Sequence, residues 1–99
     1  MKAISIPAEG EAQVVEIDNE LTALQKAVGG HIETVTIASD ACLICDEEGR
    51  LKGKPLNARA SILGILVVGD VLVVGVNEDD FTDVPEPMIR LFKERWPVL

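Results

Sequence analysis

The sequence predicts a single α+β domain: a mixed, mostly antiparallel sheet of five to six strands, helices mainly on one face, and a C-terminal helix. Three observations support this prediction. The chain has 99 residues, which suits one compact domain. Apolar residues make up 47% of the chain and aromatic residues only 3%, so Val, Ile, Leu and Ala build the core. Short apolar stretches separated by Gly, Pro, Asn and Asp are typical of strands joined by turns.

Two strands and a helix are expected in the first part of the chain. Residues 2–6 alternate polar and apolar side chains, and residues 13–17 are expected to pair back on them as a second strand. Asp18-Asn19 supplies an N-cap for a helix over about residues 20–28, whose apolar positions follow the spacing of one buried face. Gly29-Gly30 ends this helix, because glycine adopts the left-handed conformation that closes many helices.

Two further strands and a hairpin are expected in the middle of the chain. Residues 33–38 alternate, with their Val and Ile side chains toward the core. Residues 41–45 are apolar throughout, as in a strand that is covered on both faces. Residues 46–50 are expected to form a hairpin turn with Gly49 at positive φ, which closes onto a strand over residues 50–54.

A short helix and a central strand are expected next. Asn57 can cap a short helix that runs through Leu63. The apolar runs 65–68 and 71–74 flank Gly69-Asp70. Two interpretations stay open there, since Gly at the first central position suits a tight hairpin turn and a simple loop before one central strand suits the same pattern.

An acidic linker over residues 78–83 and a helix over residues 84–96 are expected to complete the domain. The apolar face of that helix carries Met88, Leu91, Phe92 and Trp96. If the sheet does not cover this face, Phe92 and Trp96 provide a homodimer contact.

The most informative stretch is the basic segment over residues 46–60. Four of the chain's nine Lys and Arg residues lie in it, and no acid follows Glu48 until Asp70, although the net charge is -8. Three cations at alternate positions share one face of an extended segment, and a helix start beside them offers free N–H groups. The alternative is an exposed edge strand, on which Lys and Arg side chains prevent pairing with another strand. The predicted small-anion site consists of Arg50, Lys52, Lys54, Asn57 and Arg59.

The cysteines, the histidine and the acidic linker give little support for a redox, catalytic or metal site. Cys42 and Cys45 form a Cys-x-x-Cys motif, but an offset of three in a strand puts the sulfurs on opposite faces, so buried structural thiols are expected. His31 is the only histidine, and Glu33 or Asp40 is a candidate to orient its ring, but no nucleophile is identified. The acids of the linker lack the spacing of a calcium loop. We expect no metal and no cofactor.

Composition restricts the partners and the location of the chain. Seventeen acids against nine bases argue against a nucleic-acid-binding protein, which needs a basic footprint. The balance fits a soluble cytoplasmic protein or, less often, a protein that presents an acidic face to a basic protein partner. No segment is long and apolar enough to span a bilayer, so no membrane contact is expected. The first residues do not resemble a signal peptide, so a cytoplasmic location is expected.

Four blocks of sequence, over residues 24–33, 46–51, 55–60 and 69–75, occur in an order and spacing that resemble a known family. They are similar to the domain of unknown function 3846 family, small proteins from bacteria, plasmids and phages, and the likeness covers roughly residues 1–76. Where that family usually has Asn-Glu-Glu-Gly, this chain has Asp46-Glu47-Glu48-Gly49, which keeps the turn chemistry. The resemblance implies a mobile-element or accessory setting and brings no established activity.

Two classes of function compete. The sequence favours a small non-enzymatic accessory protein that binds a partner protein or a small anionic ligand, because it contains no recognisable nucleophile–base pair, metal set or phosphate loop. The alternative is an enzyme with an unrecognised active site around His31 and residues 50–59.

Overall fold

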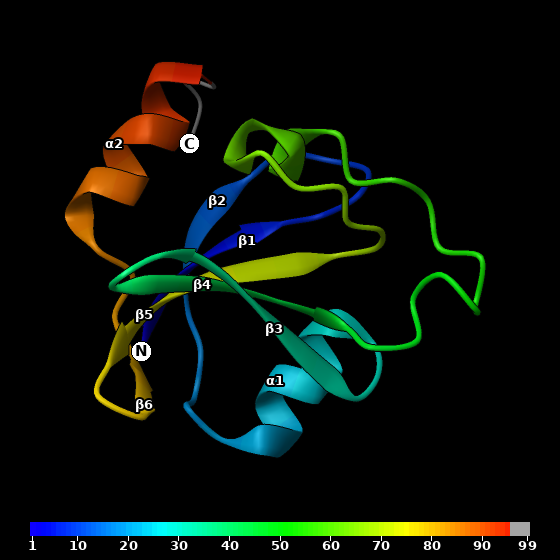
Figure 1. Cartoon of the computed structure of the whole chain (residues 1–99), viewed down its shortest axis with the longest axis horizontal. Coiled ribbons are helices and arrows are strands. Elements are labelled where there is room, and N and C mark those ends of the chain that lie inside the picture. The colour runs from blue at the N-terminus through cyan, green and yellow to red at the C-terminus, as the bar shows by residue number, and fades with distance from the viewer. Residues whose placement is uncertain (96–99) are drawn as a thin grey trace.

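The computed structural model describes residues 1–95 of the chain. The described elements are, in order, β1 (Lys2–Ile6), β2 (Gln13–Glu16), α1 (Leu21–Val28), β3 (Ile32–Ala38), β4 (Ala41–Asp46), the 3-10 helix η1 (Arg59–Leu63), β5 (Val71–Asn77), β6 (Asp80–Thr82) and α2 (Glu86–Arg95) (Figure 1). The predicted α+β class, with six strands and a C-terminal helix, is confirmed.

The six described strands form one sheet in which every pairing is antiparallel. The strand order is β2-β1-β5-β4-β3, and β6 pairs with β5. The first half of β5 pairs with β1 and its second half with β6, while β4 lies along its other edge. The last long strand of the chain is therefore the central one, β2 and β3 are the end strands of this order, and β6 pairs with β5 alone.

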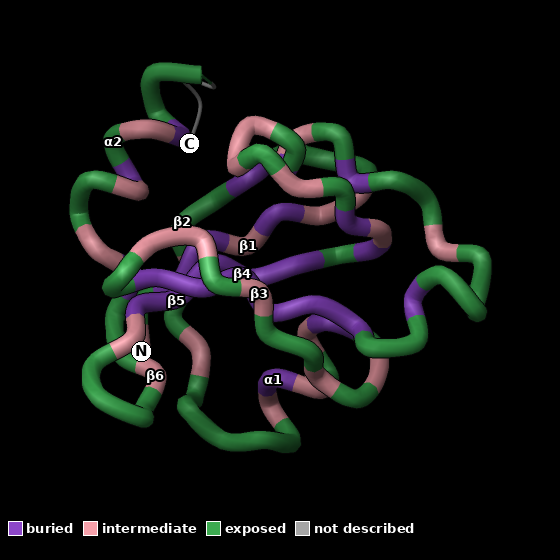
Figure 2. The backbone as a smooth tube through the Cα atoms, viewed as in Figure 1, coloured by how far each residue is buried: buried purple, intermediate pink, exposed green. Residues whose placement is uncertain are grey.

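The sheet has helical cover on both faces, not mainly on one face as predicted. Leu24 and Val28 of α1 pack on one face, whereas Ala60 of η1 and Phe92 of α2 pack on the other. All six residues of β4 are buried, and so are the first five of β5 (Figure 2). Because successive side chains of these two strands point to opposite faces, an apolar run in them requires cover on both sides.

The condition set for a homodimer contact is not met at Phe92, since this side chain is fully buried against its own sheet. Its neighbour in that prediction, Trp96, lies outside the described residues. Helix α2 therefore completes the core of one face instead of presenting Phe92 to a partner.

The strand predicted over residues 50–54 does not form. Residues 47–54, which we call the basic loop, are a series of turns, and the backbone N–H of Lys54 donates to the carbonyl of Gly49 at 3.0 Å. The chain thus turns back on itself after β4 instead of pairing with it. The alternating cations mimicked a strand pattern, but their side chains have partners inside the fold, as described below.

The conformation predicted for Gly49 is also wrong. Positive φ occurs four residues later, at Gly53, with φ 69°. Gly49 is instead a point of close packing, because a Cβ on it would lie 2.9 Å from Cγ2 of Val68. A glycine is needed at this position for space and not for φ.

Of the two interpretations of residues 65–68, the loop before one central strand is confirmed. Within residues 1–95 this run forms a single β-bridge, between Leu56 and Val68, and β5 begins after the Gly69-Asp70 turn. Val67 is buried in the core cluster beneath α2 and η1. Its apolar character therefore reflects packing and not a strand.

The acidic linker predicted over residues 78–83 is a hairpin arm, because β6 pairs with β5 through a turn in which Glu78 has φ 59°. Asn19 was expected to cap α1, but its side-chain amide donates to the carbonyl of Phe81 at 3.0 Å. The N-cap position of α1 is Glu20, which makes no side-chain cap bond. The side chain of Asn19 therefore contacts the β5–β6 hairpin and does not cap α1.

We expect a side chain at Gly75 to destabilise the sheet strongly, because a Cβ there would clash with the carbonyl oxygen of Asp83. Gly75→Ala should lower the free energy of unfolding by about 3 kcal/mol, the upper end of ordinary overpacking. Gly64→Ala is the control, since Gly64 has φ 80° and open space around it, and should cost only the backbone strain of about 1–2 kcal/mol. Equal losses in urea denaturation would contradict the close approach.

Candidate functional site

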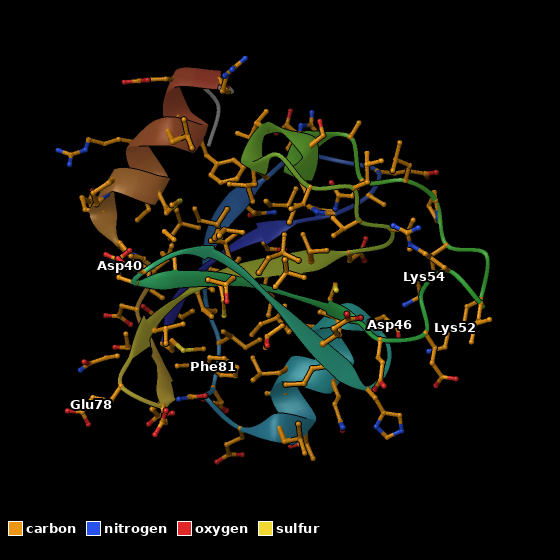
Figure 3. All side chains as sticks on the ribbon, viewed as in Figure 1. Asp40, Asp46, Lys52, Lys54, Glu78 and Phe81 are labelled. Carbon is orange, nitrogen blue, oxygen red and sulfur yellow. The ribbon has the colours of Figure 1, made fainter. Side chains whose placement is uncertain are left out.

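The basic loop folds around a buried carboxylate. Asp46, the last residue of β4, has a side chain that is 1% exposed. The Nζ atoms of Lys52 and Lys54 each lie 2.8 Å from its Oδ2, and the backbone N–H of Glu48 donates to Oδ1 at 2.9 Å. Figure 3 shows the two lysines of the loop and Asp46 of the strand end close together. The concentration of cations in this acidic chain therefore has a negative partner within the fold.

The same two lysines bind the C-terminus of α1. Lys54 Nζ donates to the carbonyl of Val28 at 2.8 Å, and Lys52 Nζ donates to the carbonyl of Gly29 at 3.1 Å. The last carbonyls of a helix lack partners within it and carry partial negative charge, so cations stabilise them. We call Asp46, Lys52, Lys54 and these two carbonyls the lysine clamp.

The helix exit at Gly29-Gly30 leaves room for the lysine clamp. Gly29 has φ 80°, which confirms the predicted left-handed end of α1. A Cβ on Gly30 would lie 2.5 Å from Asp46 Oδ1 and 2.5 Å from Lys52 Nζ. The pair of glycines was predicted only as a helix stop, and the structure adds a second role, since Gly30 lets the charged groups approach the helix.

The lysine clamp holds Asp46 in its charged form. Its hydrogen bonds from Lys52 first, then from Lys54 and from the N–H of Glu48, lower the pKa of Asp46 far below its ordinary value, against the opposing effect of burial. A buried carboxylate with three donors is stable only while those donors remain. The arrangement is therefore sensitive to the loss of either lysine.

The other members of the predicted anion site bind elsewhere. Asn57 is buried, and its amide donates to the carbonyls of Ile6 at 2.8 Å and Gly69 at 2.9 Å, while its oxygen accepts from the N–H of Ala60. The predicted cap of the short helix is thus confirmed, and the side chain has no donor left for a ligand.

The two arginines of the predicted site lie on either side of Asn57 along the chain. Arg50 donates from Nη2 to the carbonyl of Leu66 at 3.1 Å. Arg59 begins η1 and is half-buried. The structure therefore brings Lys52 and Lys54 together on one carboxylate, whereas Arg50 joins the loop to residues 65–68.

A cavity of about 170 Å³ lies beside Arg50, between the end of the sheet and residues 65–68. Two leucines on its lining are largely exposed, Leu51 at 87% and Leu66 at 68%. Its wall consists of Glu33, Val35, Cys45, Asp46, Glu47, Arg50, Leu51, Leu66, Val67 and Val68. This cavity was not predicted from the sequence, because Leu51 was expected on a strand that does not form and residues 65–68 were left open between a strand and a loop.

The remaining candidate residues are placed as follows. Cys42 and Cys45 are free and buried on opposite faces, as predicted, and burial raises the pKa of both thiols. The ring of His31 is exposed, and its contact is Gln25 Nε2 at 3.5 Å from Nδ1, not Glu33 or Asp40. Within residues 1–95, no three His, Cys, Asp or Glu side chains gather as a metal site requires.

We expect the contribution of Asp46 to stability to disappear in acid. The pKa of Asp46 is lowered in the folded chain and about 3.9 in the unfolded one, so its charge stabilises the fold above about pH 4 and stops doing so as the pH falls further. The gap in unfolding free energy between the wild type and Asp46→Asn should therefore shrink below about pH 4.

Urea denaturation at a series of pH values measures this gap. Asp79→Asn, on the exposed turn between β5 and β6, is the matched control and should change stability little at any pH. A gap for Asp46→Asn that is the same at neutral and acid pH would contradict the charged role of Asp46.

Comparison with known proteins adds the family and the fold. No curated protein matches the chain. The crystal structure of the small RNA methyltransferase HEN1 matches with a TM-score of 0.61 and 22% identity over 92% of this chain, which spans 15% of that chain. At this identity the likeness shows a shared fold and no activity. Among residues 1–95 no helix has the length and apolar character needed to cross a membrane.

A family model matches residues 1–97. The match confirms the family inferred from the four sequence blocks and extends it through the β5–β6 hairpin and α2. The chain belongs to the family described as domain of unknown function DUF3846.

Proposed function

We propose that this chain is a non-enzymatic binding module for a partner protein. Its docking surface consists of the cavity beside the basic loop, with Leu51 and Leu66 as exposed apolar contacts and Glu33, Glu47 and Arg50 as charged groups on the wall. A mobile-element setting and a cytoplasmic location are parts of the proposal that rest on the sequence alone.

The observation that carries the proposal is the exposure of two leucines beside one cavity. Single exposed leucines are common on protein surfaces and need no explanation. Leu51 and Leu66 come from segments that are 15 positions apart, yet both line the same concavity, which has charged groups around it. An apolar centre within a polar rim is the usual anatomy of a protein interface.

The size of the cavity favours a side chain over a cofactor. Small-molecule sites usually measure about 300–1,000 Å³, whereas this cavity is about 170 Å³. It suits one or two side chains of a partner. The enzyme alternative around His31 gains no support from the contact of that ring, since Gln25 is neither a nucleophile nor a carboxylate that would activate it.

The small-anion alternative requires a ligand to compete with Asp46 for Lys52 and Lys54. Displacing Asp46 would leave a buried carboxylate without its cations, which is strongly unfavourable. We therefore expect pyrophosphate, titrated into the wild type by calorimetry, to release no binding heat. A measurable affinity that disappears in Lys52→Ala/Arg59→Ala would favour the anion site over the protein interface.

The proposal is tested with peptides selected on the wild-type chain from a random library displayed on phage. Replacing both exposed leucines, in Leu51→Ser/Leu66→Ser, should weaken the selected peptides about tenfold or more, as truncation of interface anchors does. Fluorescence anisotropy of the labelled peptides measures the change. Thermal unfolding should change little, because neither leucine is buried.

Leu21→Ser is the matched control. Leu21 is 56% exposed on α1, on the opposite face of the sheet from the cavity, so its loss should leave peptide binding unchanged. A selection that returns no binders would contradict the proposal. Peptides that bind equally well to the wild type and to Leu51→Ser/Leu66→Ser would contradict it too.

A further inference from the structure

Strand β3 is an outer strand with regular, little-protected backbone over residues 32–36, and a register shift follows between Thr36 and Ala38. Among residues 1–95 this seven-residue strand pairs only with β4, and Glu33 is its one charged member. Natural sheets usually protect such an edge with lysines, prolines, bulges or a short strand, and β3 has only the register shift at its C-terminal end. The opposite edge follows this rule better, because β2 has only four residues.

The register of β3 on β4 identifies the backbone groups that point outward. The N–H of Glu47 donates to the carbonyl of His31 at 2.8 Å, so these two residues are a hydrogen-bonded pair. Bonded and non-bonded pairs alternate in an antiparallel ladder, so Glu33 and Val35 bond to β4. The backbone groups that point away from β4 are those of Ile32, Thr34 and Thr36.

No hydrogen bond to the outward N–H and C=O groups of Thr34 or Thr36 is found within residues 1–95. They therefore offer the hydrogen-bonding pattern that an added antiparallel strand would take. Recognition by strand addition obtains its affinity from such main-chain bonds and its selectivity from pockets for alternate side chains.

The cavity lies beside this edge and on one face of it. Glu33 and Val35 of β3 belong to its wall, together with Cys45 of β4. Val35 and Cys45 also pack in the cluster under η1 and α2, so the cavity opens on that face of the sheet. Because the side chains of a strand alternate, every second residue of an added strand would point to the cavity face.

The charge around the cavity favours a basic segment over a second copy of this chain as the strand that adds to β3. Two carboxylates of the cavity wall, Glu33 and Glu47, are exposed, and Arg50 is the one cation on it. The net charge of the chain is -8, so a second copy would bring the same negative charge to the edge. A partner segment that carries Lys or Arg is instead attracted by these carboxylates.

The geometry points to β3 as the edge onto which an extended, basic segment of a partner protein adds as a strand, with one apolar side chain in the cavity beside Leu66. This inference rests on the proposed function, since it gives the docking surface its mode of recognition and its partner class.

The experiment uses the peptides selected on the wild-type chain. Amide hydrogen exchange followed by NMR should slow at Thr34 and Thr36 when a peptide binds. The matched control is the opposite edge, where the hydrogen bond from Ile17 N–H to the Met1 carbonyl makes Val14 and Glu16 the outward residues of β2. Exchange at Val14 and Glu16 should not change.

Two further measurements test the strand geometry and the charge. N-methylation of single peptide amides should weaken binding about tenfold or more at every second position and little at the positions between, because only alternate amides face β3.

The selected peptides should carry more Lys and Arg than Asp and Glu. Glu33→Gln should weaken the binding of these peptides and reduce its salt dependence.

The outcomes separate this inference from the proposed function. Peptides that depend on Leu51 and Leu66 but protect neither Thr34 nor Thr36 would overturn strand addition and leave the docking surface standing. Protection of Thr34 and Thr36 that rises with protein concentration in the absence of peptide would assign the edge to a second copy, which also overturns the inference. Selected peptides that carry more Asp and Glu than Lys and Arg would contradict the inference that the added segment is basic.

Discussion

The charge pairing of Asp46 with Lys52 and Lys54 is the interaction on which the candidate site depends. The carboxylate lies at the end of a strand whose residues are all buried, where an unpaired charge would be strongly destabilising. The two ammonium groups also bind the last carbonyls of α1. One cluster thus joins the end of β4 and the loop that follows it to the end of α1, whose bonded carbonyls lie 23 and 26 residues before the two lysines in the sequence.

The position of the docking surface follows from this cluster. The side chains of Lys52 and Lys54 reach the end of α1, and the basic loop turns back on itself where the N–H of Lys54 donates to the carbonyl of Gly49. Arg50 and Leu51, which precede the lysines, are then placed against residues 65–68, where Arg50 bonds to the carbonyl of Leu66. Asn57 completes the arrangement, since its buried amide joins β1, the turn before β5 and η1. Residues that suggested a ligand site therefore build the frame beside which the cavity lies.

Much of the fold was predictable because its pattern is local. Alternation fixed β1 and β3, and the continuous apolar run of β4 indicated cover on both faces, from which the opposite orientations of Cys42 and Cys45 followed. Asn57 was recognised as a cap because capping residues act within one helical turn.

The lysine clamp was not predictable, because the helix end that it binds is distant in sequence from the two lysines. Lys54 binds the carbonyl of Val28, 26 residues away, and the alternation of cations from residue 50 to 54 imitates a strand face. Val67 belongs to an apolar run that resembles a strand, yet it is buried by packing under η1 and α2. Local periodicity does not distinguish a residue that lines a strand from one that is held by a tertiary contact.

The most direct test of this account is amide hydrogen exchange in Asp46→Asn, compared with the wild type at neutral pH. If Asp46 joins the basic loop to α1, the amides of residues 52–54 and of Val28 to Gly30 should lose protection together, while those of β1 and β5 keep theirs. Unchanged protection in the loop and at the end of α1 would contradict the account, because the loop would then hold its conformation without the carboxylate.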